Sequence, residues 1–132
     1  MAYGFLDLAS TASVQAAQEA HGSLAFWSGF TGSRKFDRFT ETEKKFIANR
    51  DSFYIATVSE TGWPYVQHRG GPSGFMKVLD DRTLGFVDFR GNRQYITQGN
   101  VSADDRAALF LMDYPGQKRI KIYTHVEVKR IA

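Results

Sequence analysis

Residues 53–72 read FYIATVSETGWPYVQHRGGP, and this stretch decides the fold of the chain. β-Branched and aromatic side chains dominate residues 52–59, which predicts a β-strand. A Glu-Thr-Gly turn follows at residues 60–62, and residues 64–69 then form a returning strand that begins with a proline, where no ladder hydrogen bond is lost. The stretch therefore predicts a β-hairpin that leads into a loop at residues 70–74.

The strand pattern continues towards the C-terminus. Asp80-Asp81-Arg82 forms a turn between strands expected at residues 75–79 and 83–89. Residues 106–112 (RAALFLM) form an apolar strand, and a turn at residues 113–116 leads into a last strand with alternating side chains. One face of this last strand carries Ile120, Ile122, Val126 and Val128, and the other carries Lys121, Tyr123, His125, Glu127 and Lys129. Six closely spaced strands predict a mainly β (α+β) fold, a six-stranded antiparallel barrel with a few short helices.

Three short helices are expected around these strands. Ser10 is expected to cap a helix that runs through Gln18, and Gly22 and Ser23 end it; a loop with isolated aromatic side chains follows. Residues 40–43 (TETE) have the form of a capping box before a helix at residues 41–50. Asn92 is expected to cap a helix at residues 93–98, which Gly99-Asn100 ends. We expect two regions, an N-terminal arm at residues 1–39 and a barrel domain at residues 40–132.

Composition excludes several classes of function. The chain has 132 residues, no cysteine and a formal net charge of +3, and 42% of its residues are hydrophobic. Disulfides, thiolate nucleophiles and cysteine-ligated metals are therefore excluded, and the three histidines are too far apart in sequence for a helical metal site. The longest apolar run, residues 107–112, is too short to span a bilayer. We expect a cytoplasmic protein with no metal and no membrane partner.

The end of the fourth expected strand offers a candidate anion site. Gly91 lets the backbone turn there, and the expected helix start at Asn92 would bring free N–H groups and the positive end of the helix dipole near Arg93 and Arg90. Such a site suits a phosphate. The alternative is that Arg93 is an ordinary solvated residue of a first helical turn.

The end of the second expected strand offers a second candidate site. Gln67 and Arg69 share one face of the strand, and His68 lies on the other, because side chains alternate. Gly70 and Gly71 would let a flat ligand or another backbone approach closely. The alternative is a polar edge strand that enters a flexible loop.

Two weaker candidates have simpler explanations. Asp104 and Asp105 could form an acid/base pair, but their position before a strand favours a solvated turn. The basic last strand could bind a nucleic acid, but a solvated face of an amphipathic strand explains its charge as well. We therefore expect no nucleic-acid partner.

Two stretches together, FYIATVSETGWPYVQHRGGP at residues 53–72 and LGFVDFRGNRQY at residues 84–95, followed by the apolar strand, resemble the pyridoxamine 5′-phosphate oxidase-like family of FMN-binding split barrels. The resemblance covers about residues 40–130. It implies a six-stranded antiparallel split β-barrel and a homodimer that binds FMN at the subunit interface.

The resemblance also assigns residues to the cofactor. The family has a basic residue at the end of its second strand that contacts the FMN phosphate region, and this position falls in Gln67–Arg69 without a decision among the three. The family's phosphate-binding Gly-Ser-Arg-Lys turn matches residues 91–94, and the residues along its flavin match residues 87–89. The cofactor-binding residues that we expect are Gln67, His68, Arg69, Gly70, Val87, Asp88, Phe89, Asn92, Arg93 and Gln94.

This chain departs from the family pattern at two points. Gln94 stands where many members have lysine, so Arg69 or Arg90 would have to supply the missing charge. The chain also ends at Ala132, directly after the last expected strand. In the vitamin oxidases a further C-terminal segment covers the flavin and grips pyridoxamine phosphate, so we do not expect that particular reaction of this sequence.

The function implied by the resemblance is that of an FMN flavoprotein, an oxidoreductase that transfers hydride or electrons through the bound flavin. No catalytic side chain is assigned, because the flavin itself would do the chemistry. The alternative is a non-catalytic flavin or haem carrier. The sequence does not decide between the two.

Overall fold

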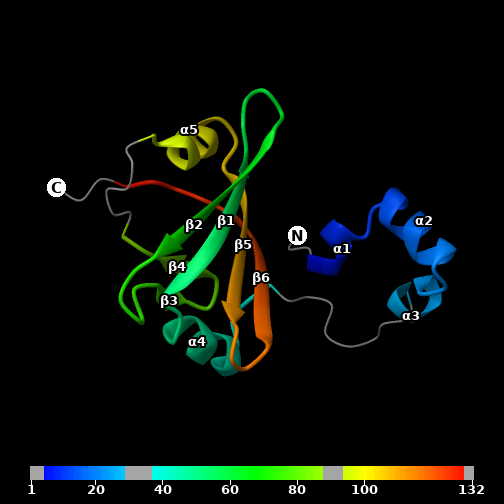
Figure 1. Ribbon diagram of the computed structural model, residues 1–132, viewed down its shortest axis with the longest axis horizontal. Coiled ribbons are helices and arrows are strands. Elements are labelled where there is room, and N and C mark those ends of the chain that lie inside the picture. Colours follow the sequence, from blue (N-terminus) through cyan, green and yellow to red (C-terminus); the bar gives the residue numbers. More distant parts are fainter. Residues whose placement is uncertain (1–4, 29–36, 88–93, 130–132) are drawn as a thin grey trace. The chain divides into compact units, whose positions relative to one another are not determined.

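The computed structural model describes residues 5–28, 37–87 and 94–129 (Figure 1). The chain divides into two compact units, Met1–Phe39 and Thr40–Ala132. The first unit contains the helices α1 (Phe5–Ala9), α2 (Ala12–Ala20) and α3 (Leu24–Ser28). The second unit contains α4 (Glu41–Ala48), β1 (Ser52–Val58), β2 (Pro64–Gly70), β3 (Lys77–Asp80), β4 (Thr83–Gly85), α5 (Ile96–Ala103), β5 (Arg106–Asp113) and β6 (Lys118–His125).

The first unit is more helical than the sequence predicted. Thr11, not Ser10, caps α2, because the Thr11 hydroxyl accepts a hydrogen bond from the N–H of Val14 at 3.3 Å. Gly22 follows the helix with a φ of 77°. The prediction of a loop after this helix was wrong in part, since α3 forms there. The rings of Phe26 and Trp27 in α3 pack edge to face at 5.0 Å. A helix of one turn leaves almost no periodic signal, which is why the pattern did not predict it.

The predicted hairpin at residues 52–69 is confirmed. β1 pairs antiparallel with β2 from Ser52 opposite Gly70 to Val58 opposite Pro64. Gly62 provides the positive φ of 85° that the intervening turn needs. β1 also pairs with β5, and β5 with β6, which gives a four-stranded antiparallel sheet in the order β2-β1-β5-β6.

Within the described residues, the second sheet consists of β3 and β4. Its predicted turn is confirmed, and the Asp80 carboxylate accepts the N–H of Arg82 at 2.8 Å. Both strands are shorter than predicted, because the aromatic rings beyond their ends pack on β1 instead of extending the ladder. Phe75 stacks on Phe53 at 5.9 Å, and Phe86 meets Phe53 edge to face at 4.9 Å. The prediction of a strand up to Phe89 was therefore wrong for residues 86 and 87, and residues 88 and 89 lie outside the described ranges.

The helix predicted at residues 93–98 is displaced along the chain. α5 begins at Ile96, with Tyr95 at its N-cap position in a left-handed conformation (φ 55°), so the assignment of Asn92 as the cap was wrong. Gly99 and Asn100 lie inside the helix instead of ending it. The reason is tertiary: the Asn100 amide donates a buried hydrogen bond to the Thr57 hydroxyl at 3.0 Å, which holds this turn against β1.

The last strand also ends earlier than its alternating pattern predicted. β6 stops at His125, and the N–H of Val126 then donates to the carbonyl of Asp105 at 2.8 Å. The side chains of residues 126–129 alternate as in a strand, but these residues do not continue the pairing with β5. The hydrogen bond from Val126 to Asp105, in the loop before β5, takes the place of a strand pair there.

The core lies on the inward face of the four-stranded sheet. β1 contributes Phe53 and Ile55, and β5 contributes Leu109 and Leu111. α4 adds Ile47, and the loop before β3 adds Met76, each almost fully buried. In Figure 1, α4 and α5 lie towards opposite ends of this sheet.

The architecture agrees with the predicted fold class. Six antiparallel strands form two sheets, accompanied by short helices, as in a split-barrel-like α+β fold. Among the described residues no strand ladder joins the two sheets into a closed barrel. The connection between them is made by side chains, chiefly by the rings around Phe53.

Arg50 ties α4 to β5, and its removal should destabilise the domain. Its side chain, 14% exposed, donates from Nε to the Phe46 carbonyl and from Nη1 to the Met112 carbonyl, each at 3.1 Å. Arg50→Ala leaves both carbonyls without these donors, so we expect the free energy of unfolding to fall by about 2–3 kcal/mol in urea titrations. Arg50→Lys keeps the charge but cannot donate in the same two-pronged geometry, so its free energy of unfolding should lie between those of Arg50→Ala and the unsubstituted chain. An Arg50→Ala variant as stable as the unsubstituted chain would contradict this role.

Candidate functional site

Strand β2 sorts its three polar residues onto two faces. Gln67 and Arg69 are half-buried and lie opposite Ile55 and Phe53 of β1, on the inward face of the sheet. His68 is exposed on the outward face, where its ring meets the Tyr54 ring edge to face at 5.3 Å. The predicted alternation of these side chains is therefore confirmed. Any ligand held by Arg69 from the inward face would not be reached by His68.

Gln67 is the centre of a small hydrogen-bond network. Its side-chain oxygen Oε1 accepts one hydrogen bond from Arg69 Nη2 at 3.2 Å and another from the Thr97 hydroxyl at 2.7 Å. Thr97 belongs to the first turn of α5 and is only 6% exposed. The network thus joins the end of β2 to the start of α5 and holds one side of the Arg69 guanidinium.

A second buried hydrogen bond docks the same helix. Asn100 lies three residues after Thr97, so both side chains project from one face of α5. Asn100 donates to Thr57, which lies on the inward face of β1 and is 2% exposed. Two side-chain hydrogen bonds, one to each strand of the hairpin, therefore fix α5 over its inward face.

The first turn of α5 lies beside this network, because Thr97 belongs to it. Tyr95 at the N-cap position makes no capping hydrogen bond with its side chain, so the first-turn N–H groups are left to other acceptors. The positive end of the helix dipole lies at the same place. Gln94 precedes Thr97 by three residues, so its Cα lies within about 11 Å of that of Thr97. A half-buried guanidinium near the start of a helix is an arrangement that can hold an anion.

Sequence reasoning missed Thr97. It lies 30 residues from Gln67, and nothing in the local pattern links the two positions. The helix was also expected to end at Gly99-Asn100, which hid the shared face of Thr97 and Asn100. Only a correct helix register could have pointed to this residue.

The expected cofactor residues divide into two groups. Gln67 and Arg69 lie together, Gly70 ends the same strand, and Val87 and Gln94 are exposed. Asp88, Phe89, Asn92 and Arg93 lie outside the described residues. The structure thus brings Gln67 and Arg69 to the start of α5 and separates His68 from them.

The two glycines after β2 do not both leave open space. A Cβ atom on Gly71 would lie 2.9 Å from Cγ of Phe75, so the space beside this glycine is filled by a ring of the same chain. A Cβ atom on Gly70 would meet its nearest neighbour, the Asp51 carbonyl oxygen, at 3.4 Å, an ordinary contact. The close approach expected at Gly71 is therefore made by Phe75, not by a ligand.

The acidic pair before β5 behaves as a surface turn. Asp104 binds Arg106 Nη2 at 2.7 Å, and Asp105 binds Nδ1 of His125 at 2.8 Å. The hydrogen bond from the Arg106 side chain is the largest cause that lowers the pKa of Asp104 from 3.8 to about 2. An aspartate that is ionised throughout the neutral range does not serve as a general acid. Two carboxylates held by two different basic groups agree with the solvated turn that the sequence favoured.

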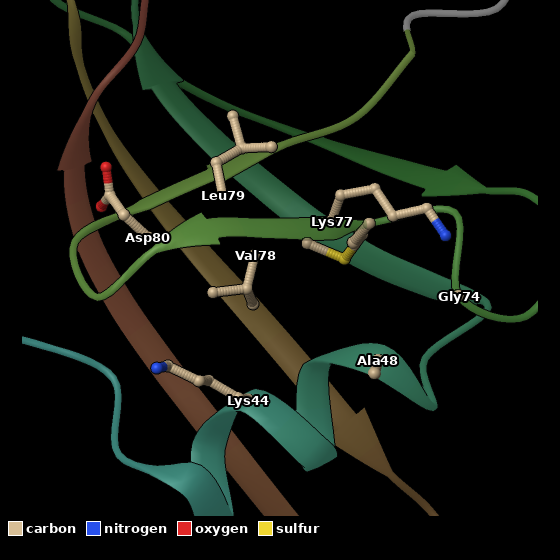
Figure 2. A pocket seen from close by; sticks show the side chains of 8 residues that line it. Lys44, Ala48, Gly74, Lys77, Val78, Leu79 and Asp80 are labelled. Carbon is tan, nitrogen blue, oxygen red and sulfur yellow. The ribbon is translucent and has the colours of Figure 1, made fainter.

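A shallow cavity of about 400 Å³ lies between α4 and β3, and none of its lining residues belongs to the hydrogen-bond network of Gln67. Figure 2 shows Lys44 rising from α4 below it and Lys77 extending from β3 above it. Lys44 pairs with Asp81 at 2.7 Å, and this hydrogen bond raises the pKa of Lys44. None of the expected cofactor residues lines this cavity, whose lining residues are Lys44, Ala48, Gly74, Met76, Lys77, Val78, Leu79 and Asp80.

Metal and membrane sites receive no support within the described ranges. No cluster of three or more histidine, aspartate or glutamate side chains there could hold a metal ion. None of the helices in those ranges has the length and apolar character needed to cross a bilayer.

The fold and the network define a class of protein: a split-barrel-like antiparallel domain with a basic residue held at the end of its second strand. The family model described as Pyridoxamine 5′-phosphate oxidase matches residues 39–130, so the chain belongs to this family of flavin-binding proteins. The match contains both stretches on which the resemblance rested, and the resemblance is confirmed. No curated protein and no solved structure gave a significant match.

The contact at Gly71 can be tested by comparing the two neighbouring glycines. Gly71→Ala forces the Phe75 ring from its stack on Phe53, and we expect a loss of about 1–3 kcal/mol in the free energy of unfolding. Gly70→Ala is the matched control and should change stability by less than about 0.5 kcal/mol, since its Cβ meets only ordinary contacts. Equal losses in urea titrations of the two variants would contradict the packing described for Gly71.

The Asp104–Arg106 pair predicts a pH dependence at the acidic end. The folded-state pKa is lowered to about 2, below the ordinary value, so the contribution of the ionised carboxylate is complete above about pH 4 and is lost as pH falls towards 2. Arg106→Ala should move the Asp104 pKa back up towards 3.8. An NMR titration of the Asp104 carboxyl in the unsubstituted protein and in Arg106→Ala measures this shift, and an unchanged pKa would exclude Arg106 as the cause.

Proposed function

We propose that the chain is an FMN-binding flavoprotein that acts as an oxidoreductase, with hydride or electron transfer through the bound FMN. The observation that carries the proposal is the Arg69 guanidinium, held by Gln67 on the inward face of β2 near the start of α5. This is the strand end at which the resemblance expects a contact to the FMN phosphate region. Membership of a flavin-binding family supplies the rest of the argument.

The donor set fits a phosphate. Arginine presents paired N–H groups that suit phosphate oxygens, and the first turn of a helix adds backbone N–H groups and a favourable dipole. Neither Gln67, Thr97 nor Gln94 brings a negative charge to this place. A phosphate held there would gain charge-assisted hydrogen bonds from the guanidinium.

Each part of the chain has a distinct task in this proposal. Arg69 binds the ribityl phosphate, together with the turn at Asn92, Arg93 and Gln94. Residues 87–89 lie along the isoalloxazine ring. The bound FMN supplies the redox chemistry, and the protein binds it, orients it and limits access of water.

We propose a homodimer with FMN at the subunit interface as the assembly. The family supports this, because members of the family to which the chain belongs are usually homodimers with FMN between the subunits. The cytoplasm is the proposed location, since a chain without cysteine needs no oxidising compartment for disulfides.

A non-catalytic flavin carrier is the second candidate. Gln94, which is neutral at a position where many members carry lysine, favours it because a lost charge weakens the hold on phosphate. Addition of NAD(P)H to the flavin-loaded protein under anaerobic conditions separates the two functions. Bleaching of the flavin bands indicates an oxidoreductase, and an unchanged spectrum indicates a carrier.

The proposed phosphate site predicts a loss of affinity in single variants. Absorbance spectra of the protein after FMN addition and desalting should retain the flavin bands, and titration gives the Kd. Arg69→Ala and Arg93→Ala should each weaken FMN binding by about 1.5–3 kcal/mol, the range for a hydrogen bond to a charged group. Lys45→Ala, which removes an exposed cation from α4, is the control and should leave the Kd unchanged. A folded protein that retains no FMN would refute the proposal.

A further inference from the structure

The side-chain amide of Gln67 is held by donors from two different elements. Arg69 Nη2 reaches Oε1 from the same strand, and the Thr97 hydroxyl reaches it from α5. A carbonyl oxygen offers two acceptor positions, and these two donors fill both. The amide oxygen is thereby held towards Arg69 and α5, and the NH₂ group of the amide is directed elsewhere.

The orientation of this amide matters for Arg69. A guanidinium has only donors, so it is attracted by the oxygen end of an amide and repelled by its NH₂ end. The two ends have nearly the same shape, and packing alone selects between them poorly. The guanidinium therefore selects the oxygen end, and the Thr97 hydroxyl, which donates to the same oxygen at 2.7 Å from a residue that is 6% exposed, holds that oxygen in place beside Arg69.

The docking of α5 does not depend on this hydroxyl alone. Asn100 binds Thr57 in a separate buried hydrogen bond on the same face of the helix. Loss of the Thr97 hydroxyl would therefore leave α5 attached to β1. The loss would free the side-chain oxygen of Gln67 to move, and with it the Arg69 guanidinium that donates to this oxygen.

We propose that Thr97 is a positioning residue for phosphate recognition: through Gln67 it orients the Arg69 guanidinium towards the phosphate of the bound flavin nucleotide. This inference rests on the proposed function, because it requires Arg69 to hold that phosphate. Thr97 itself does not touch the cofactor. Its effect is on the affinity for the phosphate and not on the affinity for the ring.

The test compares FMN with riboflavin, which has the same ring and ribityl chain but no phosphate. Thr97→Val keeps the shape of the side chain and removes the hydroxyl. We expect its Kd for FMN to rise about three- to tenfold, the loss of one neutral hydrogen bond, with an unchanged Kd for riboflavin. Thr97→Ser, which restores a hydroxyl, should recover most of the FMN affinity.

Two controls isolate the pathway from Thr97 to Arg69. Ser102→Ala removes another α5 hydroxyl, which donates to the Gly99 carbonyl of its own helix, and it should change neither Kd. In an Arg69→Ala background, Thr97→Val should cause no further loss of FMN affinity, because its target is gone. Thermal unfolding confirms that each variant is folded, and Thr97→Ala takes the place of Thr97→Val if the valine variant is not.

The outcomes separate this inference from the proposed function. If the unsubstituted chain binds FMN no more tightly than riboflavin, the phosphate site is refuted, and the role of Thr97 with it. If the unsubstituted chain prefers FMN but Thr97→Val leaves that preference intact, or weakens FMN and riboflavin equally, the positioning role alone is refuted. A selective loss for FMN that serine restores and that vanishes without Arg69 supports it.

Discussion

The register of β1 is the constraint on which the rest of the second unit depends. Burial of Phe53 and Ile55, each 1% exposed, fixes which face of this strand points inward, because a slip by one residue would turn both side chains outward. β1 pairs with β2 on one side and with β5 on the other, so its register is passed to both neighbours. Arg69 and Gln67 stand opposite Phe53 and Ile55 and are carried to the inward face with them.

Placement of an amide and a guanidinium on an inward face has an energetic consequence. Half-buried polar groups lose hydration and need hydrogen-bond partners in return. α5 supplies one of these partners through Thr97, and it meets Thr57 with Asn100 by the same principle. The helix is therefore positioned by the polar demands of the hairpin, and its start comes to lie near Arg69 for that reason.

This dependence explains what the sequence could and could not predict. The hairpin, its turn and the Asp80-Asp81-Arg82 turn were predicted because strand alternation and turn chemistry are local. The limits of α5 were not, because Gly99-Asn100 is a helix-ending signal that the bond from Asn100 to Thr57 overrides. The full length of β4 was not predicted either, since Phe86 leaves the ladder to pack on Phe53.

The candidate site shows the same division. Alternation alone placed Gln67 and Arg69 together and His68 on the other face, and the structure confirms that arrangement. The same local reasoning took Gly71 for open space, because it had no means to place the Phe75 ring beside it. Thr97 escaped notice for a similar reason, as its contact with Gln67 spans 30 residues and two elements.

Strand β2 carries polar side chains on the face where an edge strand usually carries apolar ones, and the proposed phosphate site accounts for them. At the edge of an antiparallel sheet, apolar side chains normally face the core and polar ones face water. Here Gln67 and Arg69 point inward beside Tyr65, whereas Val66 and His68 are exposed on the outward face. In the proposed function, the inward polar pair serves the phosphate. A chain that bound no ligand would gain little from a guanidinium on this face, so the inward position of Arg69 favours an anionic ligand there.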